Sequence, residues 1–249
     1  MTGDPVTHFG YEQVTPAEKT ARVKKVFESV ADRYDVMNDL MSLGLHRWWK
    51  RFAVSIASAR SGQRVLDLAG GSGDVARLLA PSIGANGELV LADINYRMLE
   101  VGRDRLINAG VVDNVRILQA NAESLPFQDR RFDLITMAFG LRNVTAKDRA
   151  LSEIYRVLRP GGKALILEFS QVQNPLLARV YDAYSLKVLP KLGAWIANDA
   201  ASYRYLAESI RMHPPQHELL GMLTSAGFER CRFHNLMAGI VALHVGYRL

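Results

Sequence analysis

A glycine-rich turn flanked by carboxylates is the part of this 249-residue sequence best suited to chemistry. It reads Asp67-Leu68-Ala69-Gly70-Gly71-Ser72-Gly73-Asp74, between the apolar run 64–66 and the amphipathic stretch 75–79. Glycines let a turn be tight and let a ligand approach bare backbone, and the helix start beyond it offers free N–H groups. Asp93 lies roughly 20 residues beyond the turn, the spacing of an acid that accepts hydrogen bonds from a ribose diol. Together they predict a site for a nucleotide-like cofactor.

The turn alone leaves the identity of the cofactor open. Residues 71–76 also fit the dinucleotide fingerprint G-x-G-x-x-G/A, so NAD and S-adenosylmethionine (SAM) are both candidates. A buried turn without any ligand is the plainest alternative. Ser72 is not the nucleophile of a hydrolase elbow, because that motif needs glycine where Asp74 stands.

A regular order of apolar runs would position these residues. Strands are expected at 64–66, 89–93, 115–118, 132–138 and 163–169. Asp93 ends the second run, Asn121 follows the third, and Ala138 ends the fourth. A helix is expected at 148–158, followed by the turn Arg159-Pro160-Gly161-Gly162. In open α/β sheets ligands bind at the carboxyl ends of the strands, so these polar segments should gather at one edge.

This ordered set resembles the Rossmann-like class I SAM-dependent methyltransferases. That superfamily places one acid before the glycines, here Asp67, and a second at the end of the second strand, here Asp93. A polar-Ala-Glu sequence follows its third strand, here 121–123, and a Leu-Arg-Pro-Gly-Gly turn precedes its fifth, here 158–162. NAD enzymes share only the first two features and close with a parallel strand. This chain instead predicts a terminal antiparallel hairpin, from 228–236 through 237–239 into 240–247.

The resemblance implies the fold and the cofactor. The expected fold is α/β, with a seven-stranded, mostly parallel sheet, a C-terminal antiparallel hairpin and helices on both faces. The implied cofactor is SAM, and the residues implied to bind it are Asp67, Gly70, Gly71, Ser72, Gly73, Asp93, Asn121, Ala122 and Ala138.

Motifs outside the cofactor half narrow the resemblance to one family. They are Tyr34-Asp35-Val36-Met37-Asn38-Asp39, His46-Arg47-Trp48-Trp49-Lys50, and the segments 139–144, 181–185 and 198–210. Together they resemble the ubiquinone/menaquinone C-methyltransferases of UbiE type, from about Thr7 to the C-terminus. That family often has threonine at Ser72 and serine at Ala138. Alanine has no hydroxyl, so Ala138 would contact the cofactor only through its backbone.

The family implies methylation of a ring carbon of demethylmenaquinol or 2-methoxy-6-polyprenyl-1,4-benzoquinol. A neutral quinol carbon is a poor nucleophile, so a ring hydroxyl must be polarised or deprotonated, and the ring carbon must later lose its proton. The candidate catalytic residues are Arg142, Asn143, Tyr34 and Asp199. Arg142 and Asn143 follow the fourth strand, and a guanidinium there would stabilise a developing phenolate. The plainer alternatives are a surface salt bridge for Arg142, a core tyrosine for Tyr34 and a helix cap for Asp199.

The chain is expected to form one domain with four parts. These are a helical N-terminal lid at 1–60, the SAM-binding half at 61–170, a helical substrate insert at 171–215, and a helix with the hairpin at 216–249. One helix face of the lid should carry Val23, Val26, Phe27, Val30 and Tyr34. Pro190 and Gly193 interrupt the aromatic and apolar insert, so it cannot be one straight helix.

The composition argues against several other classes of protein and of site. The chain is 49% hydrophobic, has one cysteine and no apolar run of 18 residues, which argues against disorder, an internal disulfide and a membrane-spanning helix. His213 and His217 are separated by two prolines, so no metal site is expected. A cytoplasmic protein is expected. A methyltransferase acting on another small molecule or on RNA would share the cofactor half, but no nucleic-acid signature beyond a net charge of +6 is present.

The family's substrate also implies a membrane nearby. A polyprenyl tail lives in the bilayer, so peripheral contact with the inner face of the bacterial membrane, or with other quinone-biosynthesis enzymes, is expected. The insert, with Lys187, Lys191 and the apolar residues of 181–196, is the predicted contact surface. The aromatic and basic segment 46–51 could also sit at such an interface, or could pack its tryptophans inward.

Overall fold

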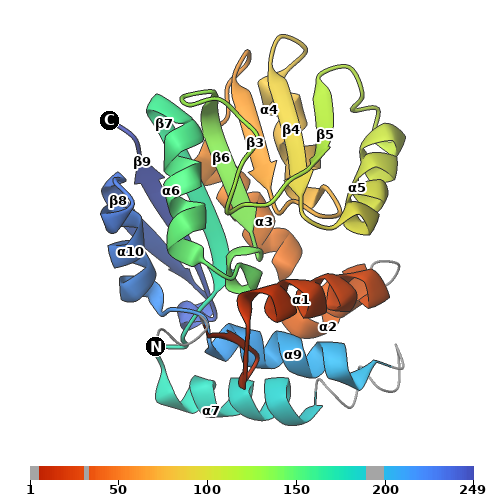
Figure 1. The fold of residues 1–249 in the computed structure, drawn as a ribbon, viewed down its shortest axis with the longest axis vertical. Coiled ribbons are helices and arrows are strands. Elements are labelled where there is room, and N and C mark those ends of the chain that lie inside the picture. Colours follow the sequence, from red (N-terminus) through yellow and green to blue (C-terminus); the bar gives the residue numbers. More distant parts are fainter. Residues whose placement is uncertain (1–5, 31–33, 189–198) are drawn as a thin grey trace.

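A seven-stranded sheet forms the centre of the molecule (Figure 1). The computed structural model describes residues 6–30, 34–188 and 199–249. The sheet has the order β5-β4-β3-β6-β7-β9-β8. Its strands are β3 (Arg64–Leu68), β4 (Glu88–Asp93), β5 (Val115–Gln119), β6 (Phe132–Ala138), β7 (Leu158–Phe169), β8 (Glu229–Leu236) and β9 (Val241–Tyr247). The first five run parallel, and β9 lies antiparallel between β7 and β8. The predicted fold, including the hairpin, is confirmed.

Helices cover both faces of this sheet. One face packs against α3 (His46–Ala57), α4 (Asp74–Ile83) and α5 (Tyr96–Asn108), and the other against α6 (Lys147–Val157) and α10 (Gln216–Ser225). Successive strand residues point to opposite faces, so the neighbours Val65 and Leu66 belong to different core clusters. Both side chains are fully buried, which explains why the parallel strands read as continuous apolar runs.

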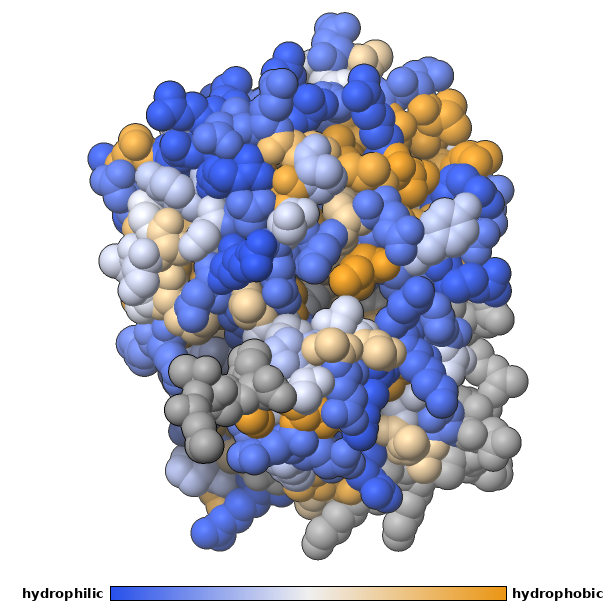
Figure 2. Space-filling model, viewed as in Figure 1, coloured by the Kyte–Doolittle hydropathy of each residue, from blue (hydrophilic) through white to orange (hydrophobic). Residues whose placement is uncertain are grey.

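The edge strand β5 is less well covered than the strands at the centre. The exposure of its side chains does not alternate regularly along the strand, and Ile117 is partly exposed. Figure 2 shows apolar side chains at the surface in the upper right, where Figure 1 places β4 and β5. Arg116 beside Ile117 is a charged side chain on this edge, a common means of preventing edge-to-edge pairing.

The N-terminal segment contains more than the predicted helices. A short antiparallel hairpin, β1 (Thr7–Phe9) and β2 (Glu12–Val14), precedes α1 (Pro16–Val30) and α2 (Tyr34–Ser42). Val23, Val26 and Val30 are buried on α1, as predicted. Tyr34 instead begins α2, so the predicted helix face does not extend to it.

Two further boundaries differ from the sequence-based expectation. β7 begins at Leu158, not at Lys163, because the predicted turn is a register shift within the strand: Phe132 pairs with Leu158, and Leu134 already pairs with Lys163. In α3, Trp49 is buried but Trp48 is exposed, so the two tryptophans do not both pack inward.

The insert is described only in part. Its described elements are α7 (Pro175–Ala183), the π-helix η3 (Tyr184–Val188) and α9 (Ala200–Arg211). Pro190, Lys191 and Gly193 lie outside the described residues, as does the side chain of Lys187. The predicted membrane-contact surface of the insert therefore stays a prediction. Within the described ranges no helix is long and apolar enough to cross a membrane, and no group of three metal-ligating side chains occurs.

Candidate active site

A cavity opens where the carboxyl ends of β3, β4, β5 and β6 face α1. It holds about 840 Å³ of empty space, including space open to solvent. Helix α1 forms one wall of the cavity, and the role of the N-terminal segment as a lid stays a prediction. The lining residues are Thr20, Val23, Lys24 and Phe27 of α1, with Leu68, Ala69, Gly71, Asp93, Ile94, Asn95, Met98, Ala120, Asn121, Ala122, Glu123, Phe139, Gly140, Asn143, Val144 and Thr145.

Asp93 and the glycine turn meet at the cavity wall. The backbone N–H groups of Gly71 and Asn95 donate to the two carboxylate oxygens of Asp93, at 3.0 and 2.8 Å. Burial raises the pKa of Asp93 to about 6. Each carboxylate oxygen has a second lone pair, so Asp93 can still accept hydrogen bonds from a ligand. Gly71 has a φ of +48°, in the left-handed region that favours glycine, and a Cβ there would lie 3.2 Å from Met98 Cε.

Asp67 lies beneath the turn and not in the cavity wall. Its side chain is fully buried and accepts hydrogen bonds from Thr136 Oγ1 at 2.8 Å and from the N–H of Ala76 at 2.9 Å. Burial raises its pKa to about 7. These bonds connect β3 to β6 and to the first turn of α4. Asp67 thus holds the shape of the site, and a direct contact with the cofactor is not what this geometry favours.

Of the other residues predicted to bind the cofactor, some line the cavity and some do not. Asn121 and Ala122 line the cavity, whereas Gly70, Ser72, Gly73 and Ala138 are not among the lining residues. A Cβ on Gly70 would lie 2.4 Å from Leu91 Cδ1, so this glycine is needed for packing the turn onto β4.

Sequence reasoning missed an apolar slot beside Asp93. Ile94 and Met98 line the cavity, next to Ala122 from the loop after β5. Ile94 is 38% exposed, an unusual position for a large apolar side chain directly after a buried strand. That exposure was not visible in the sequence, where residue 94 looks like the end of a strand.

Asn143 lies at the part of the cavity formed by the loop after β6. Its Oδ1 accepts a hydrogen bond from the hydroxyl of Tyr205, at 3.0 Å. Tyr205 is buried on α9, where its ring stacks on Phe9 at 4.0 Å between centroids, and burial raises its pKa. Tyr205 therefore remains a neutral donor, which leaves the amide N–H groups of Asn143 to donate elsewhere.

Arg142, the neighbour of Asn143, points into the protein. Its guanidinium donates to Glu168 Oε1 at 2.8 Å and to the carbonyl of Phe139 at 2.5 Å, and it lies over the Phe169 ring. The pair with Glu168 is buried, so the plainer alternative of a surface salt bridge is wrong, while the catalytic role of Arg142 stays a prediction. Glu168 also accepts from the N–H groups of Arg142 and Phe169. The ion pair fixes the turn that presents Asn143, and Arg142 itself is not among the lining residues.

Asp199 has the position of a helix cap. Its Oδ1 accepts from the N–H of Ser202 at 3.0 Å at the start of α9, and its Oδ2 accepts from the hydroxyl of Ser29 at 2.8 Å. Asp199 thereby joins α1 to α9 and is not among the cavity residues. Tyr34 opens α2, and its catalytic role stays a prediction.

Two lysines near the cavity were not predicted. The ammonium groups of Lys19 and Lys147 both donate to the carbonyl of Val144, a lining residue, at 3.2 Å. Burial, together with the nearby charge of Lys147, lowers the pKa of Lys19 to about 8. Glu123 accepts from the N–H groups of Thr145 and Ala146 on the same loop. Two ammonium groups and the carboxylate of Glu123, a lining residue, therefore lie around the loop that carries Asn143.

Comparison with known proteins identifies the family. The model of the ubiE/COQ5 methyltransferase family matches residues 15–248. The chain belongs to this family. It is 61% identical over 242 residues to the ubiquinone/menaquinone biosynthesis C-methyltransferase UbiE of Xylella fastidiosa, covering 97% of this chain and 96% of that protein. It is 56% identical over 245 residues to UbiE of Stutzerimonas stutzeri, covering 98% and 96%.

Solved structures confirm the fold. The chain is similar to a SAM-dependent methyltransferase of Thermotoga maritima, with a TM-score of 0.65, 20% identity, and coverage of 90% of this chain and 99% of that one. It is also similar to one from Aquifex aeolicus, with a TM-score of 0.58, 16% identity, and coverage of 95% and 100%. As a family member, the protein is a SAM-dependent C-methyltransferase.

The lining of the cavity fits SAM. Asp93 offers carboxylate oxygens for the ribose hydroxyls, and the backbone at Gly71 is bare, so a ligand can approach it closely. The apolar slot at Ile94 suits a planar base. NAD, which the turn alone left open, is not the cofactor of this family.

Proposed function

We propose that this protein methylates a ring carbon of a polyprenyl quinol, in ubiquinone biosynthesis, menaquinone biosynthesis or both. The expected substrates are demethylmenaquinol and 2-methoxy-6-polyprenyl-1,4-benzoquinol. Similarity over nearly the whole chain to proteins named for this activity supports the proposal. The structural observation that carries it is one cavity lined both by the ribose-binding acid Asp93 and by the hydrogen-bonding amide of Asn143.

Binding and orientation come first. Asp93 accepts hydrogen bonds from the ribose diol of SAM, and the glycine turn lets the rest of the cofactor lie against the backbone. When bound, SAM supplies an electrophilic methyl group. Helix α1 closes over the site and excludes water, with Val23 and Phe27 in its wall. Reactants held in this way are already aligned, which lowers the entropic part of the activation barrier.

The ring is activated by hydrogen bonding and by charge. The amide of Asn143 donates to a ring oxygen, and Tyr205 holds that amide in place from behind. Lys19 on α1 and Lys147 at the start of α6 add positive charge where they donate to the neighbouring loop. Both effects favour the developing phenolate, which raises electron density on the adjacent ring carbon. Arg142 contributes as a positioning residue, because its guanidinium fixes the turn before Asn143.

A membrane contact completes the proposal. The polyprenyl tail is soluble in the bilayer, so the protein must receive its substrate at a membrane surface or from another enzyme of the pathway. The basic character of the chain supports contact with anionic lipids.

The test is a product assay with purified protein, SAM and each quinol kept reduced. We expect mass spectrometry to show the addition of one methyl group to at least one quinol. Asn143→Ala should retain SAM binding in calorimetry and lose turnover at least about tenfold, which is about 1.4 kcal/mol of transition-state stabilisation. If SAM binds but neither quinol is methylated, or if RNA is methylated instead, the proposal is wrong.

A further inference from the structure

A second, strongly charged groove lies away from the cofactor cavity. It is formed by α2, α3, α4 and α5 and holds about 1020 Å³ of open space. Its lining residues are Asp35, His46, Arg47, Lys50, Arg51, Asp74, Arg77, Leu78, Arg105, Asn108 and Ala109. None of these residues lines the cofactor cavity. The mechanism described above therefore leaves the groove without a role.

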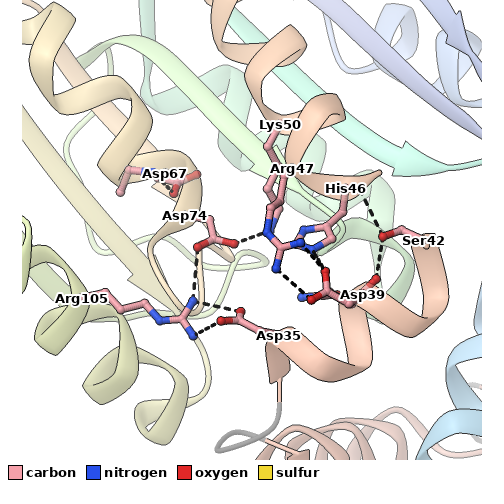
Figure 3. A network of polar contacts seen from close by, with 11 residues as sticks. Asp35, Asp39, Ser42, His46, Arg47, Lys50, Asp67, Asp74 and Arg105 are labelled. Carbon is pink, nitrogen blue, oxygen red and sulfur yellow. Dashed lines mark hydrogen bonds and ion pairs between the residues drawn. The ribbon is translucent and has the colours of Figure 1, made fainter. Parts of the chain in front are cut away.

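Ion pairs hold the four helices together at the base of the groove (Figure 3). Lys50 Nζ lies 2.7 Å from Asp74, and Arg105 bridges Asp74 at 3.3 Å and Asp35 at 2.7 Å. Arg47 pairs with Asp39 at 2.6 Å, beside the ring of His46. Figure 3 shows these side chains converging from their separate helices.

The cations of the groove outnumber its carboxylates. Five lining side chains are cationic and two are carboxylates, and even with Asp39 counted a positive surplus is left. Burial lowers the pKa of His46, so this ring adds no charge at neutral pH. The surplus lies on Arg51 and Arg77. Both are exposed, and within the described part of the chain neither makes a hydrogen bond or an ion pair.

Two exposed apolar side chains lie in and just before α3, the helix that carries three of the five cations, and they form the apolar rim of the surface considered below. Trp48 is 52% exposed and lies three residues before Arg51, so the indole and the guanidinium are neighbours on α3. Leu43, in the turn between α2 and α3, is 74% exposed. An exposed tryptophan beside basic side chains is typical of segments that sit at the headgroup level of a membrane.

We propose that the groove and its rim form a docking surface for anionic lipid headgroups. Arg51 and Arg77 bind the lipid phosphates, while Trp48 and Leu43 enter the headgroup layer beside them. A lipid surface contacts both the arginines and the apolar rim, whereas a soluble phosphate contacts the arginines alone. The apolar rim therefore favours a lipid surface. This inference rests on the proposed function, because a polyprenyl quinol is presented by a bilayer.

The test is sedimentation with phosphatidylcholine vesicles, with and without phosphatidylglycerol, at low and high salt. Arg51→Glu with Arg77→Glu is the test variant. The matched control is Arg149→Glu with Arg232→Glu, which changes the net charge equally at exposed sites outside the groove. We expect salt-sensitive binding of the wild type and control to anionic vesicles, and binding at least about tenfold weaker for the test variant. Trp48→Ala should weaken binding in high salt as well as low, because its contribution is apolar.

Three further readouts separate the outcomes. Calorimetry with SAM should give equal affinity for all variants, which shows that they are folded. Methylation of a short-tailed, soluble quinol should be unchanged by Arg51→Glu with Arg77→Glu, so a failure of the proposed function would appear there and not in vesicle binding. Equal vesicle binding of test and control variants would overturn the inference. So would binding of pyrophosphate by the wild type without any binding to anionic vesicles, which would assign the groove to soluble phosphates.

Discussion

Burial raises the pKa of Asp93 to about 6, although two backbone N–H groups donate to its carboxylate. The ionised form is the one that accepts hydrogen bonds from a ribose diol. A raised pKa means that protons compete with SAM once the pH falls below about 6. We expect SAM affinity to be constant near neutral pH and to fall by up to about tenfold per pH unit below the pKa. Titration calorimetry at several pH values measures this.

Asp93→Asn supplies the control for that pH dependence. The amide cannot titrate, so its SAM affinity should be lower than that of the wild type at neutral pH, by about 2–3 kcal/mol, and flat towards acid. Parallel curves for the two proteins would show that another group causes the pH dependence.

Arg142 and Glu168 form a buried ion pair with side chains only 3% and 1% exposed. Arg142→Ala should cost about 3–5 kcal/mol of unfolding free energy, because Glu168 is left charged and buried without its partner. Arg142→Lys keeps the charge but loses the planar fork, so we expect SAM binding to survive and turnover to fall at least about tenfold. Denaturant unfolding and steady-state kinetics measure the two effects. An alanine variant of native stability would rule out the positioning role.

The sequence identified residues whose role follows from their place in a motif, such as Asp93 and Asn143, both of which line the cavity. It could not place Lys19, because a lysine in an amphipathic helix looks like part of the solvent face. Lys19 is buried only because α1 packs across the loop at Val144, a tertiary contact without a local signal. For Arg142 the sequence predicted a side chain at the reacting ring, whereas in the structure the guanidinium points into the protein. Its partner Glu168 lies in the strand predicted at 163–169, but the positions of these residues in the sequence did not show that the guanidinium turns towards it.

At the scale of elements, the glycine turn depends on α5 behind it. A Cβ on Gly102 would lie 2.6 Å from the carbonyl oxygen of Gly71 and 2.8 Å from Leu91 Cδ2. Gly102→Ala should therefore displace the turn, weaken SAM binding and cost about 1–3 kcal/mol of stability. Thermal unfolding and calorimetry with SAM are the measurements.

Gly221→Ala is the matched control for Gly102→Ala. Gly221 lies within α10, and a Cβ there would meet nothing within 4 Å. The same chemical change should therefore stabilise the protein, by roughly 0.5–1 kcal/mol, and leave SAM affinity as it is. If the two variants shift the unfolding temperature in the same direction, glycine at position 102 is not needed for the close approach of α5 to the turn.

Secondary-structure elements could be predicted where the burial of their side chains imposes a pattern of apolar residues on the sequence. The parallel strands are covered on both faces, so their apolar runs were clear, and the C-terminal hairpin followed from its turn. The hairpin of β1 and β2 was missed because three-residue strands have no periodicity to detect. The early start of β7 was missed because Pro160 and the glycines of its bulge look like a turn.

At the scale of the whole molecule, long-range contacts assemble both proposed surfaces. Asp199 joins α9 to α1 through Ser29, so the helix that forms one wall of the cavity is tied to α9. Arg51, Arg77 and Arg105 come from three different helices and meet only in the folded chain. The sequence shows their charges as spread along the chain. It therefore predicted a membrane contact at the insert or at segment 46–51, and did not show that Arg77 and Arg105 lie beside Arg51.

The proposal that this protein methylates carbon, and does so on a quinol ring, has one most direct test. Purified protein is incubated with SAM carrying a ¹³C-labelled methyl group and a reduced demethylmenaquinol, and the product is examined by NMR. We expect a ¹³C methyl resonance of an aromatic C-methyl group, with loss of the ring proton at that carbon. A methoxy resonance would mean transfer to oxygen and would show that the protein is not a quinol C-methyltransferase, as would the absence of any labelled quinone when SAM binds normally.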